Sequence, residues 1–509
     1  MNYMIRRLMA IIVATVFPTT YCIYNGYTQS TAPSNFELAA SQLGFNGYEK
    51  ANVHVSAADQ QEALLKQLQM AGYFTDEQLW RTLIGLGIQQ PELAFKQLSF
   101  SMQQSKANQR DPNQFIAKIL RKNLGKQTIL DTEDMLDFIL YTAQNAFGRA
   151  PGQERNTLCT ENWMQCYQQA YVDNARILRL IDREVPLHKD YDSVWIAGAS
   201  RFSLITRMVD YYYALLRYTL HIHGDVLVLA GNRELFANLD GVTPLIQDKL
   251  IEAYKTHTDV DTLDFTSLVE DNNARIEEGK AYILKLGAQC NIRLDPLSPF
   301  IQYTNQEACP PGRFPGRVYP NYAKGKSRKL TETVMVQNVI ATFFDTKSVQ
   351  VIDTATDRYK RPTTATTARD AAIAFMERIG AGTYGDKKEF VILYVTNNPY
   401  IERQTLSSQG ILNKVVADYN RLHHTAYRVR LEGIGCKCQQ NIARIHSEFA
   451  ALIAEKWQKA YQGKTTKRAI EDLQFQHRNH LKTLPPIPGL SKEKRSITFF
   501  QHLFDVYLP

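Results

Sequence analysis

The sequence predicts an α/β protein built on an open, Rossmann-like parallel sheet with helices on both faces. Five short segments carry apolar, often β-branched residues at consecutive positions, which is typical of strands that are buried on both faces. Stretches with helical spacing separate them, and each segment ends in small or polar residues. The segments are SVWIAGAS (193–200), DVLVLAGN (225–232), SVQVIDTA (348–355), EFVILYVT (389–396) and YRVRLEGIG (427–435). We therefore place the α/β domain at residues 190–440 and expect the five polar ends to line one edge of the sheet.

The regions that flank this domain are predicted to be helical. Residues 25–150 begin with a polar stretch and then carry apolar residues mainly at helical spacing. Residues 441–509 suggest a helical, basic C-terminal extension. A long insertion at about 240–330 separates the second and third strands and contains a basic, Pro-rich loop. That loop either closes over an anionic ligand or is a solvated loop without a catalytic role.

Length and charge exclude some classes of protein. The chain has 509 residues, 44% of them hydrophobic, which is enough for roughly two or three cores. Its formal net charge of +8 is modest, and the basic residues are spread out except near the C-terminus and around 313–329. Proteins that bind nucleic acids usually concentrate such charge in a stripe, so we expect no nucleic-acid partner.

Residues 1–24 have the layout of a secretory signal peptide. Arg6 and Arg7 precede an apolar run of about ten residues, which is short for a membrane span. We expect an exported, periplasmic protein. The alternative is an uncleaved anchor that extends through Ile23 and Tyr24 and associates the protein with the membrane, facing the periplasm.

Six cysteines follow Cys22, an even number that suits an oxidising compartment. They are Cys159, Cys166, Cys290, Cys309, Cys436 and Cys438. Disulfide bonds are the first interpretation: the first two could close a short loop, and the last two, too close for an easy mutual bond, could reach the middle pair. A four-cysteine zinc site is the alternative, without a second Cys-x-x-Cys pair to favour it. We predict no metal site and identify no cofactor.

The segment GAGTYG contains Gly380, Gly382 and Gly385 and matches the dinucleotide-binding fingerprint letter for letter. That fingerprint must leave a strand and open a helix, so that the pyrophosphate meets the helix N-terminus. Here the glycines follow a predicted helix and precede a strand. We therefore predict a helix C-cap followed by a turn.

Two arginines favour an anionic ligand at the polar edge of the sheet. Arg403 is expected near the start of the helix after the fourth strand, where backbone N–H groups and the helix dipole already favour negative charge. Arg207 is expected to approach the same edge from the first crossover helix. The alternative for both is a structural salt bridge.

Two carboxylates are the catalytic candidates, as a general base or a metal ligand. Glu332 follows Thr331 at a predicted helix start, where it would equally suit the helix dipole. Asp370 lies in a helix that begins with several threonines, of which Thr367 could donate to a ligand and at least one must cap the helix. Asp370 could instead simply orient Arg403 or Thr367.

Two motifs resemble those of the SanA, ElyC and YdcF family of bacterial envelope proteins over about residues 190–435. VTNNPYIERQ resembles the family's V-T-S-x-x-H-x-x-R-A motif, and TTARDAA resembles T-x-E-N-A. WIAGASRFSLITRMVDYYYALL, LVLAGN and TETVMV resemble, in the same order, its first strand with Gly loop and Arg-bearing helix, its strand ending in Ser-Gly, and its S-E-A helix start.

The resemblance implies a Rossmann-like fold and a role in envelope polysaccharide maintenance with a nucleotide-like or phosphate-bearing ligand. Tyr400 stands where the family has His, and Asp370 where it usually has Asn. Carried over residue by residue, the resemblance points to Gly198, Arg207, Gly231, Glu332, Thr367, Asp370, Thr396 and Arg403. With Asn397 and Tyr400 added, the predicted ligand-binding set is Gly198, Arg207, Gly231, Thr367, Thr396, Asn397, Tyr400 and Arg403.

Two classes of function follow from these observations. The first is an exported envelope protein, enzyme or not, that binds or processes an anionic small molecule or a lipid-linked sugar intermediate at the sheet edge. The second is a non-catalytic envelope interaction protein on a relic α/β scaffold, whose flanking helical regions make the contacts.

Overall fold

The computed structural model describes the α/β domain and part of the helical region beside it. The described residues are 35–50, 53–70, 123–124, 127–128, 168–265, 272–292, 294, 330–344, 349–354 and 362–460. The predicted signal or anchor, most of the N-terminal helical region, the basic loop of the insertion and the end of the C-terminal extension lie outside them. Within the described residues, no helix combines the length and the apolar character that crossing a membrane requires.

Five parallel strands form the central sheet, as the sequence predicts. They are β6 (Ser193–Ala197), β8 (Val226–Gly231), β9 (Val349–Thr354), β10 (Glu389–Asn397) and β11 (Arg428–Cys436). Their order in the sheet is β11-β10-β6-β8-β9, and every neighbouring pair is parallel. This is a doubly wound arrangement: the chain builds from β6 through β8 to β9 on one side and then adds β10 and β11 on the other.

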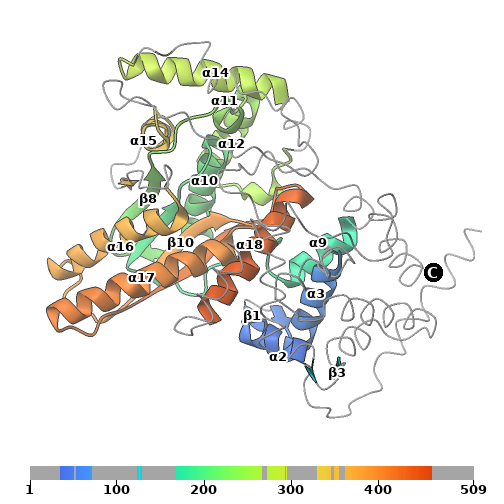
Figure 1. Cartoon of the computed structure of the whole chain (residues 1–509). Coiled ribbons are helices and arrows are strands. Elements are labelled where there is room, and N and C mark those ends of the chain that lie inside the picture. The colour runs from blue at the N-terminus through green and yellow to red at the C-terminus, as the bar shows by residue number, and fades with distance from the viewer. Residues whose placement is uncertain are drawn as a thin grey trace, which may run out of the picture.

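Helices cover both faces of the sheet (Figure 1). On one face, Val194, Ile196 and Val228 pack with α10 (Arg201–Arg217), α12 (Pro244–Thr256) and α15 (Glu332–Phe343). On the other face, Trp195 and Tyr394 pack with α16 (Thr364–Gly380) and α17 (Ile401–His423). Successive strand residues point to opposite faces, so a strand covered on both sides is apolar at consecutive positions. The edge strand β9 is only partly buried, because it has a neighbour on one side alone.

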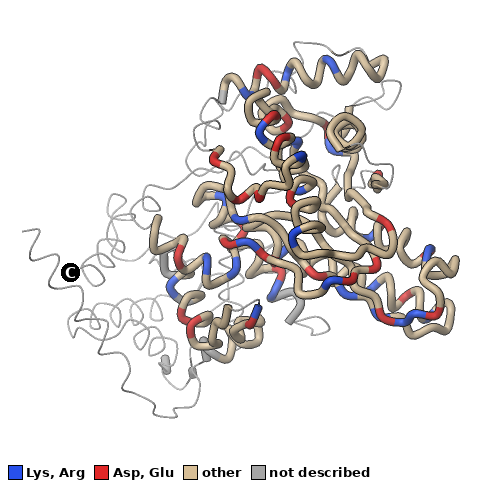
Figure 2. The backbone as a smooth tube through the Cα atoms, turned by 180° about the vertical axis from the view of Figure 1, so that it is seen from behind, with Lys and Arg blue, Asp and Glu red and all other residues tan. Residues whose placement is uncertain are grey.

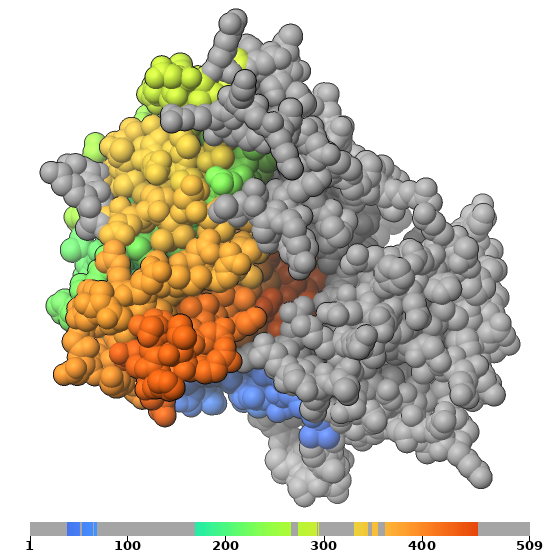
Figure 3. Space-filling model, turned by 60° about the vertical axis from the view of Figure 1, so that its left-hand side comes forward, coloured from blue at the N-terminus to red at the C-terminus, as the bar shows by residue number. Residues whose placement is uncertain are grey.

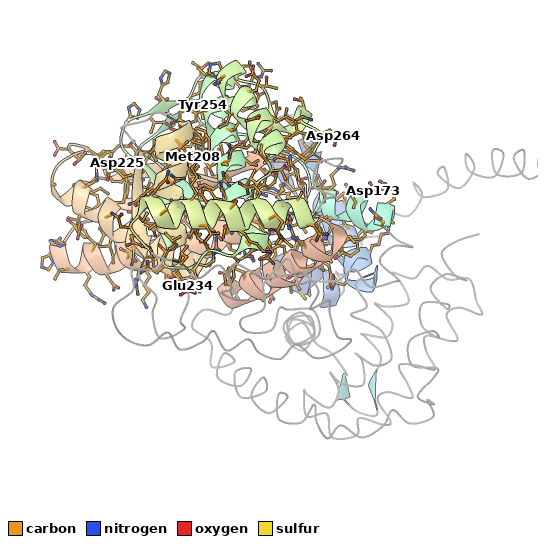
Figure 4. The ribbon with its side chains drawn as sticks, turned by 90° about the horizontal axis from the view of Figure 1, so that it is seen from above. Asp173, Met208, Asp225, Glu234, Tyr254 and Asp264 are labelled. Carbon is orange, nitrogen blue, oxygen red and sulfur yellow. The ribbon has the colours of Figure 1, made fainter. Side chains whose placement is uncertain are left out.

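The insertion between β8 and β9 adds further elements. These are α11 (Ala237–Asp240), α12, η3 (Val260–Thr262) and α14 (Asn272–Gln289), followed by α15. In Figure 4, α14 lies across the α/β domain as seen from above. It packs closely on α11, because a Cβ atom on Gly279 would lie 2.1 Å from the backbone oxygen of Ala237. The insertion is therefore joined to the domain rather than separate from it.

Helices from both flanking regions pack together beside α17. They are α2 (Asn35–Gln42), α3 (Ala57–Met70), α9 (Gln168–Ile177) and α18 (Ile442–Ala460), and α18 contacts both α17 and α9. Tyr171 of α9 and Nδ1 of His446 in α18 form a hydrogen bond of 2.9 Å. The described start of the C-terminal extension thus packs against the α/β domain. In the view of Figure 3, the described N-terminal elements lie next to and below α17.

Short strand pairs complete the described elements. Strands β1 (Tyr48–Lys50) and β2 (Val53–Val55) form a hairpin inside the region predicted to be helical. The pair β3 (Asn123–Leu124) and β4 (Gln127–Thr128) is also antiparallel, and β5 (Asp190–Tyr191) runs parallel to β7 (His221–Ile222).

The segment GAGTYG forms the predicted helix end and turn, with Ala381 as the C-cap residue. Helix α16 ends at Gly380, and Gly382 and Gly385 have φ angles of 77° and 61°. A side chain is strained in this left-handed region, which explains glycine at both positions. The dinucleotide fingerprint is correctly rejected.

Candidate functional site

The topological switch point of the sheet lies between β6 and β10. These strands are neighbours, yet the helices that follow them, α10 and α17, cover opposite faces. In open α/β sheets, ligands bind outside the carboxyl ends of the strands at such a point. The predicted residues Gly198, Thr396 and Asn397 all lie at this edge.

The loop from β6 into α10 is short and close to its neighbours. A Cβ atom on Gly198 would lie 2.1 Å from the backbone oxygen of Leu229 and 2.4 Å from Oε1 of Glu332. Glycine is therefore required at this position for steric reasons, whether or not a ligand binds there.

The N-cap residue of α10 does not cap the helix with its own side chain. Ser200 occupies the N-cap position, but its hydroxyl makes no capping hydrogen bond and instead lies 3.4 Å from the hydroxyl of Ser203. The backbone N–H of Arg201 donates to Oδ1 of Asp240 at 3.3 Å. Because the first N–H groups of a helix lack intrahelical acceptors and lie at the positive end of its dipole, this end of α10 suits an anion.

Arg207 is buried beneath the loop and holds it in place. Its side chain is 2% exposed, and Nη1 donates to the backbone oxygens of Ala197 at 2.7 Å and Gly198 at 2.9 Å. Nε donates to Oδ1 of Asn397 at 2.9 Å. The structure thus brings Gly198, Arg207 and Asn397 together and joins the ends of β6 and β10 through one guanidinium.

Thr396 and Tyr400 take part in the turn from β10 into α17. Thr396 is fully buried, and its hydroxyl donates to Oε1 of Gln404 at 2.7 Å. Tyr400 is the N-cap residue of α17, is 5% exposed, and donates its backbone N–H to the oxygen of Asn397 at 2.9 Å. These contacts give both residues a structural role at the start of α17.

Arg403 forms an ion pair with the C-terminal helix. Its Nε donates to Oε2 of Glu448 in α18 at 2.6 Å, with 12% of the arginine side chain and none of the glutamate side chain exposed. Burial would lower the pKa of Arg403, but the Glu448 carboxylate raises it above the ordinary value. The structural alternative considered for Arg403 from the sequence is therefore realised, while binding of a ligand by this residue stays a prediction.

Glu332 belongs to a buried ionic cluster at the ends of β6 and β8. Its Oε2 accepts from Nε of Arg233 at 2.9 Å, and the same guanidinium donates to Asp240 at 3.0 and 3.1 Å. The side chains of Arg233 and Asp240 are 7% and 0% exposed. Glu332 thus lies against the loop at Gly198 and between charged neighbours, which is compatible with a role at the site and equally with holding the insertion on the sheet.

The other predicted residues have local structural contacts. A Cβ atom on Gly231 would lie 2.5 Å from Pro362, so this glycine permits close packing. The Thr367 hydroxyl lies 3.2 Å from the backbone oxygen of Thr363, whose side chain forms the capping box of α16 with Thr366. Asp370 accepts from the adjacent Arg369 at 3.1 Å. These three residues thus have other neighbours than those described above for Arg207 and Arg403.

Sequence reasoning missed several charged residues near this edge. Arg233 lies directly after the second strand segment, so its position was visible although its partners were not. Asp240, Arg183 and Asp210 gave no signal, because their partners lie in distant parts of the chain.

The described cysteines and acidic residues provide no metal site. Cys290, Cys436 and Cys438 have free thiols, so the predicted disulfides among the last cysteines are not observed for these three; the remaining cysteines lie outside the described residues. Burial raises the pKa of Cys438 to about 12. In the part of the chain that the structure describes, no group of three or more His, Cys, Asp or Glu side chains could hold a metal ion.

Comparison of the chain with protein-family models, with curated proteins and with solved structures finds no match. The fold and the arrangement of residues at the switch point therefore carry the functional argument. Both define an α/β protein of the Rossmann-like class.

Proposed function

We propose that this chain is an exported envelope protein whose Rossmann-like domain binds an anionic, phosphate-bearing ligand at the edge between β6 and β10. The observation that carries the proposal is the loop of residues 198–200, which leads from β6 into the N-terminus of α10 at the switch point, where the N-cap residue Ser200 makes no capping hydrogen bond. This is the position at which doubly wound sheets bind phosphate groups.

Arg207 supports the same assignment. Its guanidinium lies directly beneath the loop and donates to the backbone oxygens of Ala197 and Gly198 and to the side-chain oxygen of Asn397. A buried positive charge below a helix N-terminus increases the local preference for negative charge, and burial reduces its screening by salt. In this proposal Arg207 positions the loop, and the backbone N–H groups of α10 contact the phosphate.

The ligand class follows from this chemistry and from the sequence. A lipid-linked sugar intermediate and a nucleotide-like molecule both carry phosphate groups, and the signal layout of residues 1–24 with the resemblance to envelope proteins favours an envelope ligand. We propose no reaction: Glu332 pairs with the buried Arg233, and Asp370 pairs with the adjacent, exposed Arg369.

The experiment replaces Ser200 with aspartate. A carboxylate at an N-cap accepts from the first N–H groups of the helix and would occupy the anion position itself. Inorganic phosphate, a nucleoside diphosphate and undecaprenyl phosphate are each added to wild type and variant, and the melting temperature is followed by fluorescence at constant ionic strength. We expect a ligand-dependent rise in wild type, and in Ser200→Asp a slightly higher starting value with no further rise.

Thr243→Asp is the matched control. Thr243 is the N-cap of α12 and likewise makes no side-chain capping bond, so its replacement adds the same charge at another helix N-terminus. This variant should keep the wild-type response to the ligand. An equal response in Ser200→Asp, or no response of wild type to any of the three ligands, would contradict the proposed site.

A second candidate is a non-catalytic interaction protein. It is favoured by the ion pair between Arg403 and Glu448, which gives an arginine predicted to bind a ligand a role in docking α18. If none of the ligands changes the melting temperature and Arg403→Ala loses α18 docking, this second candidate becomes the better explanation.

A further inference from the structure

A single guanidinium joins three carboxylates beside the ends of β10 and β11. Arg183 lies between α9 and β5, and it pairs with Asp210 of α10 at 2.6 Å. It also pairs with Asp259 at 2.5 Å and with Asp261 at 2.7 Å. Asp259 caps η3, and Asp261 belongs to it. This cluster, which we call the Arg183 hub, therefore ties the insertion to the first crossover helix and to the segment before the sheet.

The hub also reaches the chain that leaves β11. The backbone N–H of Lys437 donates to Oδ1 of Asp261 at 2.9 Å, and the Lys437 ammonium contacts the Asp261 backbone oxygen. In Figure 4, Asp264, which follows η3, lies on the same side of the molecule as α9. A movement of η3 would thus break contacts of both the insertion and the segment that leaves β11.

Asp210 is the most deeply buried member of the hub. It is 0% exposed, and its Oδ2 atom has no hydrogen-bond partner within the described structure. The side chains of Asp259 and Asp261 are 24% and 14% exposed. A buried carboxylate oxygen without a donor strongly disfavours the ionised form, so Asp210 is the group in which a proton is best accommodated.

Three carboxylates share the ion pairs of one guanidinium. The other titratable groups around Asp210 and Arg183 are Arg207, Tyr213, Tyr218, Cys436 and Lys437. Burial raises the pKa of the Cys436 thiol, so this side chain is neutral. When all three aspartates are ionised, their three negative charges meet at the one guanidinium that pairs with each of them. Lys437 reaches this cluster through contacts with Asp261, and Arg207 donates to oxygens of the β6 and β10 ends.

Burial also raises the pKa of two of the three carboxylates. It raises the pKa of Asp210 to about 6, against the lowering effect of Arg183. It also raises the pKa of Asp261 above the ordinary value. The folded state therefore binds protons more tightly than the unfolded chain at both residues, and the stability that these protons provide is lost as the pH rises through the folded pKa values.

We propose that the Arg183 hub is a pH-operated latch: protonated Asp210 keeps η3 against α10, and loss of this proton loosens η3 and the segment that follows β11. Loosening follows from repulsion among three ionised carboxylates around one guanidinium. Because η3 belongs to the insertion and Lys437 follows β11, the latch would change the mobility of the sheet edge with pH.

Hydrogen exchange of the full-length protein between pH 5 and pH 8 tests the latch. Protection factors, corrected for the intrinsic pH dependence of exchange, are measured for peptides covering residues 257–263 and 434–440, with residues 193–197 of β6 as internal reference. We expect protection of the first two peptides to fall at least about tenfold between pH 5 and pH 8, while β6 stays protected.

Three variants make the test specific. Asp210→Asn should strongly reduce the pH dependence of both peptides and leave only the part that comes from Asp261. Asp259→Asn keeps an oxygen that can cap η3 and removes one negative neighbour, so it should move the transition to lower pH. Asp248→Asn changes an exposed carboxylate of α12 and should behave as wild type. Equal protection at pH 5 and pH 8 in wild type overturns the proposal, as does an unchanged transition in Asp259→Asn or an undiminished one in folded Asp210→Asn.

Discussion

Replacing Arg403 with alanine should destabilise the protein by about 3 to 5 kcal/mol, because the change removes the guanidinium that pairs with a fully buried carboxylate. The size of the effect follows from burial. Nε of Arg403 lies 2.6 Å from Oε2 of Glu448, and the side-chain exposures are 12% and 0%. Exposed ion pairs contribute only about 0 to 1 kcal/mol, so the measured loss distinguishes a buried ion pair from an exposed one.

The chain contains a matched control for this prediction. Arg428 pairs with Glu389 at 3.2 Å, but their side chains are 82% and 73% exposed. Arg428→Ala should therefore cost less than about 1 kcal/mol. Urea unfolding followed by circular dichroism gives both free energies by linear extrapolation, and an unchanged slope would show that the unfolded states are comparable.

Two further variants separate the charge from its geometry. Arg403→Lys should recover only part of the lost stability, because an ammonium cannot reproduce the fixed hydrogen bond from Nε. Glu448→Gln, alone and combined with Arg403→Ala, completes a double-mutant cycle in which the coupling energy should exceed about 1 kcal/mol.

The opposite outcome would change the functional interpretation. If Arg403→Ala and Arg428→Ala lose the same small free energy, the pair with Glu448 contributes little to docking α18. Arg403 would then be free to serve the anionic ligand, and its loss should reduce the ligand-induced rise in melting temperature.

Further variants test the close packing at Gly198 and the buried histidine. Gly198→Ala should lower the free energy of unfolding in urea by about 1 to 3 kcal/mol, because its Cβ would lie 2.1 Å from the Leu229 oxygen. Gly410→Ala is the control: its Cβ would meet no atom within 4 Å, so it should stabilise α17 by about 0.5 to 1 kcal/mol. Equal effects of the two variants would contradict the close packing at Gly198. Burial lowers the pKa of His446 to about 3, so the stability from its neutral ring is complete above pH of about 6.5 and is lost as the pH falls towards 3. Between pH 7 and pH 4.5 the free energy of unfolding of wild type should fall by about 3 kcal/mol more than that of His446→Gln. Equal losses in the two proteins would contradict the lowered pKa of His446.

The sequence by itself determined the main elements of the α/β domain. Apolar runs and helical spacing predicted the strands and the helices between them, because the periodicity of side chains along a segment depends on local geometry and burial. The position of GAGTYG between a helix and a strand was enough to reject a dinucleotide site. Edge strand β9 resembled the central strands in sequence although it is less buried, since local pattern does not report the number of neighbours.

Only the tertiary structure decided the order of the strands and the partners of the charged residues. Arg403 was visible as a residue near a helix N-terminus, but Glu448 lies 45 positions further along the chain. Arg183 meets Asp210 and Asp261 across 27 and 78 positions. An arginine that binds a ligand and one that pairs with a distant carboxylate look identical in sequence. The electrostatic environment of a side chain depends on which segments fold against it, and only the packed chain decides that.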